Sequence, residues 1–112
     1  KEVSKGVDMK RIIDGLRYDT DSATEIADMP CNFHTSDFAY HSTKLYITKN
    51  GSWFLAGEGG PSSLWKCRAY DNNSVGGEGI RPLSKHEAMG YLESWGEIEE
   101  LEKFFSGEIT NA

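Results

Sequence analysis

Two runs of strand-forming residues flank an Asn–Gly pair in the middle of the chain, and this pattern constrains the fold most. The runs read KLYIT and WFLA, with Asn50–Gly51 between them. Aromatic and β-branched residues favour strands, and Asn–Gly favours the positive φ angles of a two-residue hairpin turn. We therefore predict an antiparallel hairpin over 44–56, in which a two-residue turn places Ile47 opposite Phe54.

Both faces of this predicted hairpin are apolar, so each needs a cover. Helices can pack on one face, and the other face requires another part of the chain or a partner. A second, shorter hairpin is predicted over 11–18, where Asp14–Gly15 joins two short apolar pieces. Such a small β-ribbon adds strand to the fold.

Three helices are predicted from their end signals. Ser22 with Glu25 fits a capping box for a short N-terminal helix that stops at Pro30. Ser84 with Glu87 fits a second capping box, for a helix that ends at Gly96. A last helix over 97–105 has apolar residues on one side and glutamates on the other.

The order of these elements indicates an α+β domain. We expect a small antiparallel sheet built around the Asn–Gly hairpin, a short N-terminal helix, and two C-terminal helices packed on one face. The 112 residues allow one core. We assign residues 10–106 to this domain, 107–112 to a C-terminal tail and 1–9 to an N-terminal tail. We expect residues 1–9 to be disordered, or to be an addition that comes from an upstream reading frame or from cloning.

Net charge and cysteine content narrow the function classes. The chain has 18 acidic and 12 basic side chains and a net charge of −6. A binder of nucleic acid or of an anionic membrane needs a basic face, so we expect neither partner. With two cysteines, no apolar signal segment and no stretch of about 20 apolar residues, we expect a cytoplasmic protein with reduced thiols.

Two glycine-flanked glutamates are the most unusual local feature. Glu58 and Glu78 lie near the two ends of a glycine-rich stretch, 57–79, that we expect to form loops and bends. There they could present carboxylates to a ligand, a sugar or a partner, or simply keep a loop soluble. Three aromatic residues that could line a binding surface with them, or pack in the core, are Tyr46, Trp53 and Trp65.

A possible metal site and a possible nucleophile each have a simpler structural interpretation. The spacing Cys-x2-His-x2-Asp-x3-His is formed by Cys31, His34, Asp37 and His41. These are zinc-ligand types, but the spacing fits no zinc finger, and a polar loop with a buried cysteine explains it more simply. Neither cysteine lies in a recognisable nucleophile motif. We predict no catalytic residue, no metal and no cofactor.

The C-terminal quarter holds most of the excess negative charge. Residues 84–112 contain seven acidic side chains and two lysines. The predicted acidic patch consists of Glu93, Glu97, Glu99, Glu100 and Glu102. Such a run is commonly a solvated helix face, but it could also occupy a basic, nucleic-acid-binding surface on another protein.

Three segments of the chain, DGLRYDT (14–20), LYITKNGSWFLAGEGGP (45–61) and IRPLS (80–84), carry a resemblance. With them, residues 10 to 105 resemble a group of small uncharacterised proteins from gut bacteria and mobile elements. The group has no established activity. The resemblance implies an autonomous bacterial domain and a phage, plasmid or transposon setting.

Two functional hypotheses follow from the sequence. The first is a non-enzymatic protein-interaction module that meets a basic partner surface through its acidic helical end, or a partner through the exposed face of the hairpin. The alternative is a small-ligand or carbohydrate-binding module, or a weak hydrolase, that uses the two glutamates and exposed tryptophans.

Overall fold

A computed structural model describes residues 8–68 and 74–112. Its first strands are β1 (Lys10–Ile13), β2 (Leu16–Asp19), β3 (Thr24–Asp28), β4 (His41–Ile47) and β5 (Trp53–Gly59). They are followed by β6 (Cys67–Arg68), β7 (Ser74–Val75), β8 (Gly77–Leu83), α1 (Lys85–Trp95), α2 (Ile98–Phe105) and a 3₁₀ turn over Ser106–Glu108. The predicted α+β class with antiparallel sheets and two C-terminal helices is confirmed.

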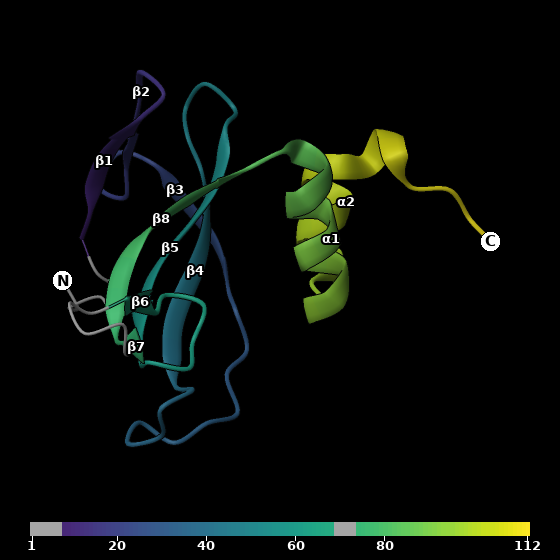
Figure 1. The fold of residues 1–112 in the computed structure, drawn as a ribbon. Helices are drawn as coiled ribbons and strands as arrows, with labels where there is room; N and C mark the ends of the chain where they lie inside the picture. Colours follow the sequence, from purple (N-terminus) through teal and green to yellow (C-terminus); the bar gives the residue numbers. More distant parts are fainter. Residues whose placement is uncertain (1–7, 69–73) are drawn as a thin grey trace, which may run out of the picture.

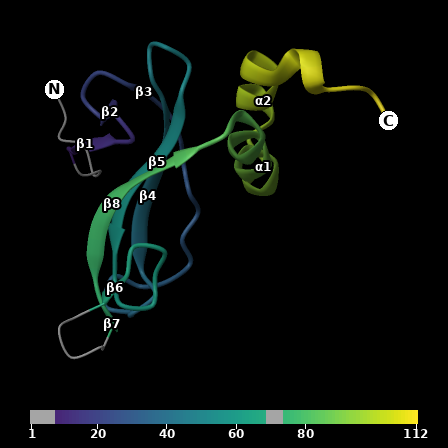
Figure 2. The same cartoon turned by 45° about the horizontal axis from the view of Figure 1, so that its top comes forward.

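A four-stranded antiparallel sheet in the order β3-β4-β5-β8 forms the middle layer. The two helices lie on one side of it and the β1–β2 ribbon lies on the other (Figures 1 and 2). The helix-side core contains Leu45, Leu55, Leu92 and Phe105, and the ribbon-side core contains Phe54. Both apolar faces of the central strands are therefore covered by the chain itself.

The predicted N-terminal helix is wrong, because residues 24–28 form strand β3. The Ser22–Glu25 pattern is a local preference, and pairing with β4 overrides it. Lys44 makes this pairing strong: its Nζ lies 2.7 Å from Asp28 Oδ1 and 3.1 Å from Glu25 Oε2. Burial disfavours the lysine's charge, but the hydrogen bonds that its ammonium group donates to both carboxylates outweigh it and raise the pKa of Lys44.

The turn between β4 and β5 has three residues at its tip rather than two. Thr48 N donates to Ser52 O at 2.8 Å and Gly51 N donates to Thr48 O at 2.9 Å. Gly51 has a φ of 88°, which fits a type I turn followed by a left-handed residue. The predicted register is therefore wrong by one residue, and Ile47 pairs with Trp53 instead of Phe54.

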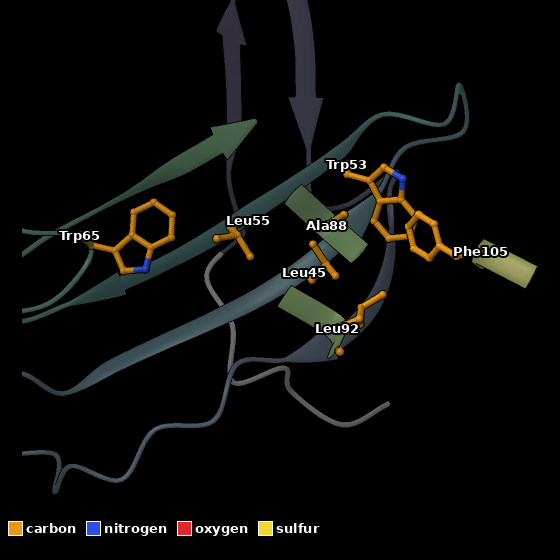
Figure 3. Close-up of a cluster of buried hydrophobic side chains, with 8 residues drawn as sticks. Leu45, Trp53, Leu55, Trp65, Ala88, Leu92 and Phe105 are labelled. Atoms are coloured by element: carbon orange, nitrogen blue, oxygen red, sulfur yellow. The ribbon is translucent and has the colours of Figure 1, made fainter. Parts of the chain in front are cut away.

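This register decides which aromatic side chain goes to which layer. Trp53 shares the helix side with Leu55 and stacks on Phe105, with ring centroids 5.3 Å apart. Phe54 takes the ribbon side, where it stacks on Tyr46 at 5.1 Å. Figure 3 shows Trp53 and Phe105 at one end of the helix-side cluster.

The other predicted turn and the helix caps agree with the structure. Asp14 and Gly15 both have positive φ and join paired strands β1 and β2, so the ribbon is confirmed. Ser84 and Glu87 form the predicted capping box. Gly96 ends α1 in the left-handed conformation, as predicted.

The N-terminal boundary of the domain differs slightly from the prediction. Met9, assigned to the tail, is buried, and its backbone N donates to Thr20 Oγ1 at 2.9 Å. Met9 therefore belongs to the fold. The rest of the predicted tail, up to residue 7, lies outside the described residues.

Candidate functional site

The two glycine-flanked glutamates lie in strands, which corrects their predicted place in loops. Residues 57–59 belong to β5 and residues 77–79 to β8, and Glu58 is directly opposite Glu78 in their antiparallel pairing. Both side chains are exposed on the ribbon side of the sheet. Arg11 Nη2 lies 3.7 Å from Glu78 Oε2, which offsets part of the repulsion between two like charges.

The flanking glycines face the opposite side, where the chain of 60–67 packs against the sheet. A Cβ on Gly57 would lie 2.7 Å from Trp65 Nε1, and a Cβ on Gly79 would lie 3.6 Å from the Trp65 ring. The glycines thus make room for an indole, whereas we had expected them to serve bends. In the repeated Gly-Glu-Gly pattern of these two strands, the glycines face the packed side of the sheet and the glutamates face solvent.

Trp65 is held by a short chain of hydrogen bonds. Its Nε1 donates to Thr43 Oγ1 at 2.7 Å, and Thr43 Oγ1 lies 3.0 Å from His41 Nδ1. Thr43 is 2% exposed. Burial lowers the pKa of His41. In neutral His41 an unprotonated Nδ1 can accept a hydrogen bond from the Thr43 hydroxyl, which then both accepts from Trp65 and donates to His41.

The predicted aromatic surface is part of the core. Tyr46, Trp53 and Trp65 are each 5–7% exposed. Burial also raises the pKa of Tyr46, with Glu25 as the next contributor. Trp53 and Trp65 belong to the helix-side core, whereas Glu58 and Glu78 face the ribbon side. The structure brings the two glutamates together and separates them from the tryptophans.

The four candidate metal ligands do not converge. His34 Nδ1 lies 3.1 Å from Ser36 Oγ, and Asp37 Oδ1 accepts a hydrogen bond from Ala39 N within an exposed loop. Cys31 and His41 instead line a cavity of about 280 Å³ beside β4. Over 8–68 and 74–112, no three side chains of metal-binding type gather in one place. Cys31 and Cys67 are both free thiols.

The predicted acidic patch lies on the helical layer. Glu93, Glu99 and Glu102 are exposed, and Glu97 and Glu100 are half-buried. Among the described residues none of these five carboxylates makes an ion pair. The position of Glu99 and Glu100 in the first turn of α2 is favourable for the helix dipole. Ile98, which precedes them in α2, is 66% exposed, so the helical layer also has an exposed apolar side chain.

Sequence reasoning missed a hollow on the outer side of α1. A shallow depression of about 350 Å³, open to solvent, is lined by Glu87, Gly90, Tyr91 and Ser94. Gly90 lies inside the helix, where glycine costs about 1 kcal/mol relative to alanine. A Cβ there would meet nothing within 4 Å. The sequence feature that could have indicated this depression is Gly90, a glycine in the middle of a helix that is capped at both ends.

Comparisons with protein-family models, with curated proteins and with solved structures found no match. Among the described residues, none of the helices has the length and apolar character needed to cross a membrane. The candidate site is the acidic helical layer formed by α1 and α2, including the depression over Gly90 on α1.

Proposed function

We propose that the protein is a non-enzymatic interaction module that binds the basic surface of another protein through its acidic helical layer. The observation that supports this most is the set of five carboxylates that make no ion pair within the described residues, together with the exposed side chain of Ile98. Protein-binding surfaces commonly combine exposed apolar side chains with charged neighbours.

The two lysines of the described helical layer contact groups other than these five carboxylates. Lys85 Nζ lies 3.1 Å from Glu108 Oε2, and Lys103 Nζ lies over the Phe104 ring, 5.3 Å from its centroid. The negative field of the remaining carboxylates is therefore open to an external cation. A basic partner would be steered to this layer at low salt. In the mobile-element setting that the resemblance implies, a nucleic-acid-binding protein would present such a surface.

The test is capture of partners from a bacterial lysate on immobilised protein, at low salt and at about 0.5 M salt. We expect bound proteins to be lost in high salt and in the double variant Glu99→Lys/Glu102→Lys. The matched control is Asp21→Lys/Glu58→Lys, which makes the same change in net charge at exposed sites outside the helical layer. Equal capture by both double variants would contradict the proposal.

A further inference from the structure

The hollow on α1 has the outline of a helix-packing hole. Its lining residues are Glu87, Gly90, Tyr91 and Ser94, which occupy positions i, i+3, i+4 and i+7 of the helix. Four residues with this spacing form the diamond that receives one side chain from a facing helix. Because the residue at i+3 is a glycine, the hole is deeper than one formed by four larger residues.

No contact among the described residues explains why position 90 of α1 is a glycine. Its backbone φ is not in the left-handed range, and a Cβ at Gly90 would enter open space. The neighbouring core residues Ala88 and Leu92 face the sheet on the other side of α1. Gly90 therefore weakens the helix without improving the packing of this molecule, which is the pattern expected where another molecule packs.

The walls of the hole offer acceptors and an aromatic face. Ser84 N donates to Glu87 Oε1 at 2.8 Å, which fixes the carboxylate and leaves Oε2 to accept from a partner. The Ser94 hydroxyl donates to Tyr91 O at 2.9 Å, so its lone pairs remain as acceptors. The Tyr91 ring packs against Trp95 with centroids 5.4 Å apart.

The residues that line the hole match the chemistry of one side chain, arginine. A guanidinium group donates several hydrogen bonds in a plane and stacks on aromatic faces, while lysine lacks the planar fork. Exposed Glu93, one turn beyond Gly90, adds further negative charge. The occupant that matches both the outline and the charge is an arginine presented by an α-helix.

We propose that the hole over Gly90 is the docking site for a basic α-helix of a partner protein, with an arginine of that helix as the inserted side chain. This inference rests on the proposed function, because it names the partner of the same acidic helical layer. It adds that the partner segment is helical and that its key contact is arginine.

The experiment uses the full chain and a labelled, alanine-rich helical peptide of about 20 residues that carries arginines one heptad apart. A second peptide has lysine at those positions. Binding is measured by fluorescence anisotropy. We expect Gly90→Leu to weaken binding of the arginine peptide at least about tenfold, and Glu87→Gln, which keeps the capping box, to weaken it about tenfold.

The matched control is Gly107→Leu, since a Cβ at Gly107 also meets nothing within 4 Å. Gly90→Leu should melt at or above the wild-type temperature because leucine favours helix, so lost binding would not reflect lost folding. Wild-type protein that fails to bind the arginine peptide, equal binding by Gly90→Leu, or equal affinity for the lysine peptide would each overturn the proposal. If Glu99→Lys/Glu102→Lys still abolishes lysate capture while Gly90→Leu does not, the hole is wrong and the acidic interaction module stands.

Discussion

Glu58 and Glu78 are opposed across β5 and β8, with their carboxylates on the same exposed face of the sheet. Like charges in directly opposed positions destabilise a strand pair. Arg11 approaches Glu78, at 3.7 Å, whereas Glu58 makes no ion pair with any residue of 8–68 or 74–112. The position with repulsion to remove is therefore Glu58.

Glu58→Lys should raise the free energy of unfolding by about 0.5 kcal/mol, because it turns the repulsive pair into an attractive one. Urea denaturation at low salt measures this, and the gain should shrink at high salt. Glu78→Lys is the matched control, since it places a lysine beside Arg11 and loses that ion pair. A gain from Glu78→Lys equal to that from Glu58→Lys would contradict the assigned geometry.

Thr43→Val should destabilise the protein by about 1–3 kcal/mol, because it leaves the buried Trp65 Nε1 without its acceptor. Thr43→Ser retains the hydroxyl and should cost less. Thermal and chemical denaturation of the pair compare the two. If valine is tolerated as well as serine, the hydrogen bond to Trp65 does not stabilise the fold.

Gly57→Ala should lower the free energy of unfolding by about 2–3 kcal/mol, because its Cβ would meet Trp65 Nε1 at 2.7 Å and the Thr43 Cα at 2.9 Å. Gly90→Ala makes the same chemical change where there is open space, and should add about 0.5–1 kcal/mol. Opposite signs in chemical denaturation are expected. Destabilisation by both would show that Gly90 has a packing role within the chain.

His41 should make stability depend on pH in mildly acidic solution. Its folded-state pKa lies below the unfolded value of about 6.5, so the unfolded state takes up the proton first as pH falls. Stability from this group is complete above about pH 7 and is lost as pH falls from the unfolded pKa through the folded one. His41→Asn removes the titration, and melting temperatures of both proteins measured across this range should diverge toward low pH. Parallel curves would contradict the prediction.

Structural features that depend only on residues close together in the sequence could be predicted from it. The Asp14–Gly15 turn needs two residues with positive φ, and the capping box at Ser84 needs the Glu87 side chain three residues later. The charge of the helical layer is likewise local. These elements depend little on the rest of the fold.

The wrong predictions concern residues whose structure depends on contacts with residues distant in the sequence. Asn50–Gly51 suits both two- and three-residue turns, and the longer one occurs with the Thr48 hydroxyl accepting from Ser52 N and Trp53 on the helix side. Glu25 was expected in a helix cap and instead pairs with Lys44, 19 positions away in the sequence. The glycines at 57 and 79 make sense only once Trp65 lies over them.

The three-layer arrangement also places all three tryptophans on one side of the sheet, with an optical consequence. Trp53, Trp65 and half-buried Trp95 belong to the helix-side core, whereas Tyr18, Tyr46 and Phe54 make up the aromatic part of the ribbon-side core. Indole emission should therefore report on the helical layer and remain nearly constant if the β1–β2 ribbon alone detaches. Tryptophan fluorescence can therefore separate the loss of the helical layer from the loss of the ribbon without an added label.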